Sequence, residues 1–223
     1  NCLLGQGERA PKVHLFSRRR AKHLRGGPKF SLRHLPIRLR HFRRQPNDSS
    51  GSLRYVRVEF AGVEFSPDNE LNGIAFQGGG RGGSYEFIQV HMNRDDALEW
   101  FGGTADIKYA VASNAADDSF DWTFGWSGRA QFIAITQRGD DADNGIEADN
   151  NEFANDLLPR SNPQIYNFTS CGDPDSNEGA EAFRAILFRR GTAVTFRNFL
   201  VLGSRTLGMQ IDGASTLTQV NNG

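Results

Sequence analysis

Residues 95–123 read DDALEWFGGTADIKYAVASNAADDSFDWT, and this stretch contains one five-residue pattern twice. Asp96-Ala97-Leu98-Glu99-Trp100 recurs 22 residues later as Asp118-Ser119-Phe120-Asp121-Trp122. Each copy opens with an acid and a small residue and then alternates apolar with acidic residues, which is typical of a short strand. Related copies lie on either side, as Asn72-Gly73-Ile74-Ala75-Phe76 and Asn144-Gly145-Ile146-Glu147-Ala148.

A second kind of short strand alternates with the first. It places a large apolar residue after a polar one, and we align its copies on Tyr55, Phe87, Tyr109, Phe132, Ile165 and Phe196. The intervals between these positions are 32, 22, 23, 33 and 31 residues, and no segment of helical period separates the strands. A short repeat that carries two or three strands is typical of a solenoid, because each coil can bury its apolar face only against its neighbours.

We therefore predict an all-β fold, a right-handed parallel β-helix. The alternative is an antiparallel β-sandwich, which also has short strands and glycine-rich turns. A sandwich does not require the same residue type at the same place in successive turns. Two sets do recur here, Asn72, Asp96, Asp118 and Asn144, and then Phe76, Trp100 and Trp122. Such recurrence favours vertical rows of like side chains, with Asn and Asp bonding to backbone groups at a corner.

The length and composition agree with one soluble domain. The chain has 223 residues, of which 38% are hydrophobic, and its apolar runs are a few residues long. A membrane-spanning helix needs about twenty apolar residues, so no transmembrane segment is expected. Two cysteines exclude a scaffold built on several disulfides and a zinc site built on Cys-x-x-Cys pairs.

The net charge of zero hides two opposite parts. Residues 1–46 hold 13 basic residues and one acid (13 − 1 = +12), and residues 47–223 hold 13 basic and 25 acidic residues (13 − 25 = −12). We interpret residues 1–46 as a segment that is not native to the fold, from a shifted reading frame, or as disordered. If the segment is genuine, its arginines make it a candidate arm for nucleic acid. Residues 47–223 are the predicted β-helix domain, a fragment of a longer protein.

Three stretches, at residues 53–62, 95–103 and 117–123, resemble a group of bacterial cell-surface proteins. These are secreted or lipid-anchored proteins with pectin-lyase-like parallel β-helices, and the resemblance covers about residues 48–213. It implies a pectin-lyase-like solenoid at an extracellular or bacterial cell-surface location, associated with the outer membrane. It implies no catalytic residues.

Acidic residues on the first kind of strand are the main functional candidates. The period of two places Glu99, Asp121 and Glu147 on the outer face, in one row with neighbours about 5 Å apart. Such a row can be a solvated acidic face. It can also bind Ca²⁺, which prefers oxygen ligands, together with three acids at the same edge, Asp117, Asp141 and Asp143.

Paired carboxyls could instead hydrolyse or eliminate a glycosidic bond, with Glu99, Asp121 and Glu147 as the catalytic acids. Polygalacturonases of similar fold add a His-Gly and an Arg-x-Lys element, and the repeat region has neither.

The tryptophans suggest a binding role. Trp100 and Trp122 fall on the inner face and are predicted to lie in the core. Trp126 follows Phe124-Gly125 in a predicted turn, where an exposed ring could stack on a sugar. We therefore predict a non-enzymatic surface module, structural or adhesive, stabilised by Ca²⁺ and binding a polysaccharide through Trp126. The alternative is a carbohydrate-active enzyme, a polysaccharide hydrolase or lyase that uses the acidic row.

Overall fold

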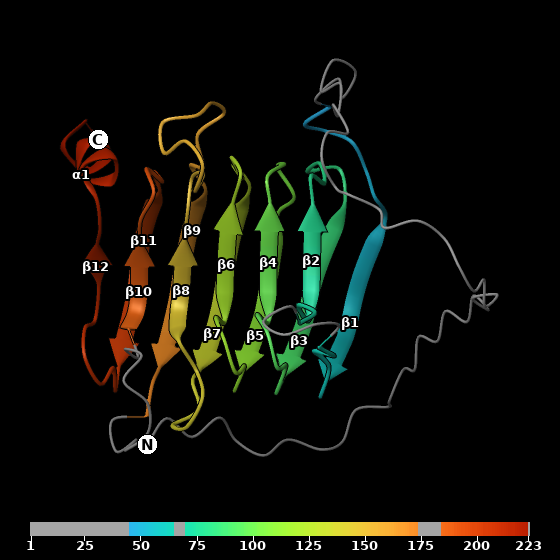
Figure 1. Ribbon diagram of the computed structural model, residues 1–223. Helices are drawn as coiled ribbons and strands as arrows, with labels where there is room; N and C mark the ends of the chain where they lie inside the picture. The colour runs from blue at the N-terminus through green and yellow to red at the C-terminus, as the bar shows by residue number, and fades with distance from the viewer. Residues whose placement is uncertain (1–44, 65–69, 174–183, 223) are drawn as a thin grey trace, which may run out of the picture.

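A computed structural model describes residues 45–64, 70–173 and 184–222. In these segments the chain winds into coils that stack along one axis, with β1 at one end and β12 at the other (Figure 1). The interpretation of residues 1–46 lies outside the described residues, except for Gln45 and Pro46. The carbonyl of Pro46 accepts hydrogen bonds from the backbone N–H of Arg81 and the hydroxyl of Thr104.

In the described segments, twelve strands form two parallel sheets of six. The odd sheet holds β1 (Ser52–Glu59), β3 (Ser84–His91), β5 (Ile107–Ser113), β7 (Arg129–Thr136), β9 (Gln164–Cys171) and β11 (Thr195–Leu202). The even sheet holds β2 (Ile74–Gln77), β4 (Leu98–Phe101), β6 (Phe120–Thr123), β8 (Asn144–Ala148), β10 (Arg184–Phe188) and β12 (Gln210–Ile211). Helix α1 (Ala214–Asn222) follows β12. The chain is therefore a parallel β-helix, and the antiparallel sandwich is wrong.

The pairing of the even strands confirms the predicted rows. Leu98 pairs with Ile74 on one side and with Phe120 on the other, so each five-residue pattern lies directly over the next. Trp100 lies between Phe76 and Trp122 in the same way. Like residues therefore stack because successive coils have the same register.

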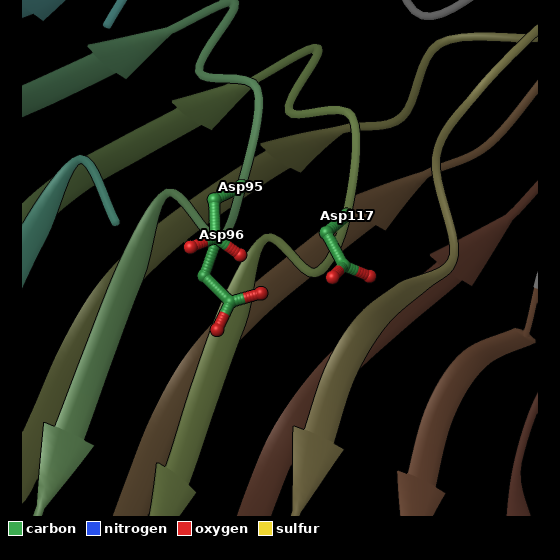
Figure 2. A group of neighbouring side chains, drawn as sticks. All are labelled: Asp95, Asp96 and Asp117. Atoms are coloured by element: carbon green, nitrogen blue, oxygen red, sulfur yellow. The ribbon is translucent and has the colours of Figure 1, made fainter. Parts of the chain in front are cut away.

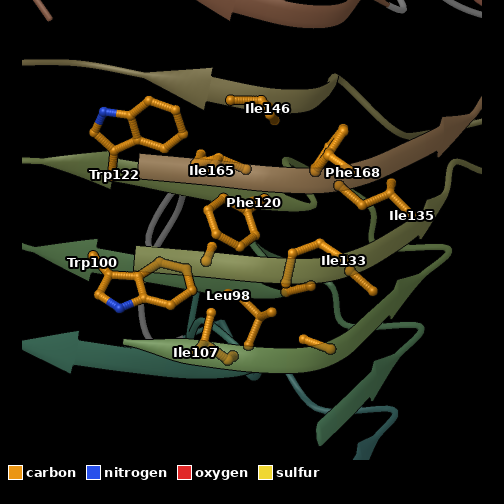
Figure 3. Close-up of a cluster of buried hydrophobic side chains, with 14 of the residues drawn as sticks. Leu98, Trp100, Ile107, Phe120, Trp122, Ile133, Ile135, Ile146, Ile165 and Phe168 are labelled. Atoms are coloured by element: carbon orange, nitrogen blue, oxygen red, sulfur yellow. The ribbon is translucent and has the colours of Figure 1, made fainter. Parts of the chain in front are cut away.

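The core lies between the two sheets. Figure 3 shows apolar side chains of the even strands, such as Trp100 and Phe120, facing those of the odd strands, such as Ile133 and Ile165. Trp100 stacks on Phe76 with ring centroids 4.7 Å apart. The predicted burial of Trp100 and Trp122 is confirmed, since both side chains are fully buried.

Each odd strand bends at one left-handed residue. Tyr55, Phe87, Tyr109 and Phe132 have φ between 55° and 59°, and they point outward. One left-handed residue in each strand puts two consecutive side chains outside and shifts the inward positions after it. The alignment on Ile165 and Phe196 is therefore wrong by two residues: Ile165 pairs with Ala130, and Asn167 and Asn198 share the left-handed position with φ of 57° and 60°.

No helix in the described segments is long and apolar enough to cross a membrane.

Candidate functional site

Eight carboxyl groups gather in three neighbouring rows on the outside of the even sheet. We call them the acidic cluster: Asp95, Asp96, Glu99, Asp117, Asp118, Asp121, Asp143 and Glu147. The corner row, Asp96 and Asp118, lies just before β4 and β6. The strand row lies on β4, β6 and β8 and consists of Glu99, Asp121 and Glu147. The outer row lies in the turns and consists of Asp95, Asp117 and Asp143. The cluster exists because the repeated pattern puts acids at the same places in two or three successive coils.

The corner row fixes the backbone. The N–H of Asp118 donates to Oδ1 of Asp96 at 3.0 Å, and the N–H of Asn144 donates to Oδ1 of Asp118 at 2.7 Å. An aspartate side chain is short enough to reach a backbone N–H at a turn, which is why this residue type recurs there. The predicted capping of backbone groups by Asn and Asp is confirmed for Asp96 and Asp118.

The strand row has the predicted register, and neighbouring side chains partly cover it. Glu99 pairs with Asp121 and Asp121 with Glu147 in the parallel ladder. Glu99 is buried, with 7% of its surface exposed, and Asp121 and Glu147 are half-buried. The amide of Asn72 donates to Glu99, and Arg189 forms an ion pair with Glu147. A freely solvated acidic face is therefore wrong, because neighbouring side chains cover the row.

The outer row completes the cluster. Figure 2 shows Asp95 and Asp96 at the turn before β4 and Asp117 at the corresponding turn before β6. Ligand atoms of these three residues lie within 4.8 Å of one another. In three further triads the ligand atoms also lie within 4.8 Å of one another. These triads are Asp117, Asp118 and Asp143; Asp96, Glu99 and Asp121; and Asp118, Asp121 and Glu147. Each triad takes its ligands from two successive coils.

Burial and mutual repulsion make these groups hard to ionise. Burial raises the pKa of Glu99 and of Glu147 to about 7. The pKa of Asp117 rises to about 6, because the surrounding protein removes water from it and Asp143 lies nearby. Burial, together with neighbouring carboxylates, raises the pKa values of Asp96, Asp118 and Asp121 well above the ordinary range. The cluster therefore needs shared protons or a cation near neutral pH.

One end of the cluster has a counter-charge. Arg189 pairs with Glu147 and, at 2.8 Å, with Asp149, and Arg190 pairs with Asp149 at 2.6 Å. Within the described segments, four carboxyl groups of the cluster form no ion pair with a basic side chain: Asp96, Glu99, Asp118 and Asp121. In addition, Oδ1 of Asp121 is buried without a hydrogen-bond partner in the described part of the chain. The middle of the cluster is therefore where a cation would gain most.

The structure brings together five of the six predicted metal ligands, Glu99, Asp117, Asp121, Asp143 and Glu147. It leaves Asp141 out: this residue is exposed, and its carboxylate lies 4.0 Å from Arg138. Three members were missed as ligands, namely Asp95, Asp96 and Asp118. The recurrence of the doublets Asp95-Asp96 and Asp117-Asp118 at a spacing of 22 residues could have revealed them.

The predicted glycan contact at Trp126 is wrong. This side chain is fully buried, its ring stacks on Trp100 at 4.6 Å, and its Nε1 donates to the carbonyl of Ala105 at 3.0 Å. Gly128 permits the inward turn: a Cβ there would lie 2.3 Å from the Ala105 oxygen and 2.5 Å from Nε1 of Trp126. The turn folds into the core because glycine allows this close approach.

The two parallel sheets and the stacked rows define a solenoid of the parallel β-helix class, with acidic rows along one flank. A family model described as the pectate-lyase-like beta helix domain matches residues 42–223. The chain belongs to this family of pectate-lyase-like β-helix domains. No curated protein and no solved structure matches it.

Proposed function

We propose that the chain is a non-enzymatic module of a bacterial cell surface, structural or adhesive, whose β-helix is stabilised by Ca²⁺ at the acidic cluster. The observation that carries the calcium assignment is the set of four overlapping triads with the buried, unpartnered Oδ1 of Asp121 among them. The resemblance to secreted and lipid-anchored β-helix proteins supports an extracellular or outer-membrane location.

The chemistry of the donors favours Ca²⁺ among common cations. Every ligand in the cluster is a carboxylate oxygen, which suits hard cations, and the triads contain no histidine or cysteine. Calcium binds oxygen at about 2.3–2.6 Å, so two of its ligands can lie up to about 5 Å apart. In each triad the ligand atoms lie within 4.8 Å of one another, which is inside this span. Magnesium demands shorter, near-octahedral geometry, which rows set by strand spacing fit less well.

Titration calorimetry of the full chain with CaCl₂ tests the proposal. The wild-type protein, freed of metal with EDTA and then of EDTA, is expected to bind at least one Ca²⁺. Asp121→Asn is expected to weaken binding at least tenfold, because Asp121 belongs to two of the four triads. The matched control is Asp141→Asn, which removes an exposed carboxylate outside the triads and should leave the affinity unchanged.

Two outcomes contradict the calcium site. The first is a wild-type protein that takes up no Ca²⁺ at pH 8, where the carboxyls with pKa values of about 6 to 7 are ionised. The second is equal affinity in wild type and Asp121→Asn when both have the same circular dichroism spectrum.

The alternative is a polysaccharide hydrolase or lyase, and one observation favours it. Glu99 and Glu147 have pKa values near 7, as a general acid requires, and they lie two strands apart, or about 9.6 Å. That spacing lies just beyond the range of about 6.5–9.5 Å between the two carboxyl groups of inverting glycosidases. Incubation with pectin and neutral glycans should show whether reducing ends or unsaturated products form. Product that is lost in Glu99→Gln would replace the non-enzymatic assignment with the enzymatic one.

A further inference from the structure

A column of exposed and half-buried aromatic rings runs along the outside of the odd sheet, away from the acidic cluster. Its members are Tyr55, Phe87, Tyr109 and Phe132, the left-handed residues of β1, β3, β5 and β7. Successive ring centroids lie 4.7, 4.7 and 5.1 Å apart, with interplanar angles of 3°, 8° and 4°. The column is thus a regular stack with the spacing of the strands beneath it.

The rings occupy positions where their backbone is strained. A bulky side chain at positive φ is an outlier among residues of its type. Stacking of each ring on its neighbour offsets part of this strain. Asn167 and Asn198, which occupy the same position in the next two coils, are residues that adopt this conformation more easily. Strained residues concentrate at functional sites, so the aromatic part of the column is a candidate for binding.

The column breaks off between Phe132 and Asn167. The Phe132 ring stacks on Tyr109 on one side. On the other side the next residue in the column is Asn167, which is too short to cover a ring and accepts a hydrogen bond from Gln131 at 3.3 Å. Phe132 remains 42% exposed. One ring face at the end of the stack is therefore left without an aromatic neighbour in the described residues.

A shallow depression of about 480 Å³ lies at this break, on the outer surface of β7, β9 and β11. Its lining includes Phe132, Asn167, Asn198 and Thr169, and none of its nine lining residues is charged. The volume lies within the range of about 300–1,000 Å³ found for ligand pockets. An aromatic face, two amides and a hydroxyl thus surround a space of ligand size.

We propose that this depression binds a neutral polysaccharide, with one pyranose ring stacked on Phe132 as the next member of the column. The proposal goes beyond the proposed function, and it does not involve the acidic cluster. A β-linked, gluco-configured pyranose presents axial C–H groups on both faces, and these carry partial positive charge. They match the negative face of an aromatic ring, while the sugar hydroxyls can bond to the amides of Asn167 and Asn198.

The uncharged lining selects against acidic sugars. No lysine or arginine lines the depression. The nearby ammonium of Lys108 lies over the stack, 5.0 Å from the ring centroid of Tyr109 and 5.5 Å from that of Phe132. A carboxylate placed among Asn167 and Thr169 would therefore lose hydration without a cation in the lining to pair with. A neutral sugar has no such cost. The ligand class is therefore a neutral β-glucan.

The test uses cellohexaose as the probe, with calorimetry and saturation-transfer NMR on the full chain. Asn167→Phe is expected to extend the column by one ring, cover Phe132 and fill the depression, and so to weaken binding at least tenfold. Phe132→Asn removes the stacking face and should weaken binding to the same extent. Both substitutions place a residue type that this column already accepts at positive φ, so the fold should be retained.

Phe124→Asn is the matched control. Phe124 also has positive φ (51°) and is 40% exposed, but it lies after β6 and does not line the depression. This variant should bind cellohexaose as the wild type does. Hexagalacturonate serves as the acidic probe and should bind at least tenfold more weakly than cellohexaose.

The proposal is overturned if cellohexaose does not bind, if hexagalacturonate binds as tightly, or if Phe132→Asn and Asn167→Phe bind like the wild type. Binding should be the same in EDTA and in CaCl₂. The glycan site can thus fail while the calcium site stands, or the reverse, and the two results are separable.

Discussion

In EDTA, the protein is expected to become less stable as the pH rises from 5 to 8. The pKa values of Glu99 and Glu147 are about 7 in the folded state, against 4.5 for an ordinary glutamate. Between these values the folded chain binds more protons than the unfolded chain, so the free energy of unfolding falls as pH rises through this window. The stability that these groups contribute is complete below about pH 4.5 and lost above about pH 7.

The size of the effect follows from the pKa change. A rise in pKa from 4.5 to about 7 lowers the free energy of unfolding by about 3 kcal/mol for each carboxyl group that ionises over this range. In a domain of this size, about 3 kcal/mol lowers the melting temperature by about 6–12 °C. His91 acts in the opposite direction, because burial lowers its pKa and its stability contribution rises with pH. One half-buried histidine opposes several carboxyls, so the net slope is expected to be negative.

Calcium should oppose this pH dependence. A cation binds the ionised carboxylates, so it stabilises the folded state most at pH 8 and least at pH 5. At a concentration of 100 times Kd it would add about 2.7 kcal/mol. Differential scanning calorimetry at pH 5 and pH 8, with EDTA or CaCl₂, measures both effects. If the melting temperature in EDTA does not change between pH 5 and 8, the carboxyl groups of the cluster ionise without destabilising the fold, and the prediction is wrong.

Trp126→Ala is expected to lower the free energy of unfolding by about 3–5 kcal/mol. The substitution leaves a cavity against Trp100 and Phe120, and it removes the hydrogen bond to the Ala105 carbonyl. Phe124→Ala, two residues earlier, removes an exposed ring and should cost less than about 1 kcal/mol.

Urea denaturation, followed by circular dichroism, compares the two variants. The same loss in both would mean that Trp126 packs no better than Phe124. A loss of oligosaccharide binding in Trp126→Phe, with stability retained, would restore a glycan contact at this residue.

The repeated pattern was sufficient to predict the solenoid, because strands in the same register carry the same residue types at the same positions. Asp96 and Asp118 recur at the same corner, and Trp100 and Trp122 on the same inner face. The bend in the odd strands leaves a weaker trace. An aromatic residue at positive φ looks like an ordinary strand residue, and Asn167 and Asn198 broke the apparent aromatic series, so the last two copies were misaligned.

The site was predicted in part for a similar reason. Alternation correctly places Glu99, Asp121 and Glu147 on one row, but it says nothing about what covers that row. Asn72 and Arg189 reach it from distant parts of the chain. The inward turn at Trp126 depends on Gly128 passing close to the Ala105 carbonyl, which is a contact between coils that local sequence does not encode.

The sharing of each acidic triad between two successive coils has a mechanical consequence. A divalent ion bound by Asp96, Glu99 and Asp121 would cross-link two neighbouring coils. Pulling the ends of the solenoid apart would then have to break ion–oxygen bonds. The tensile strength of the rod would then follow the calcium level of its surroundings, soft where the ion is scarce and stiff where it is plentiful.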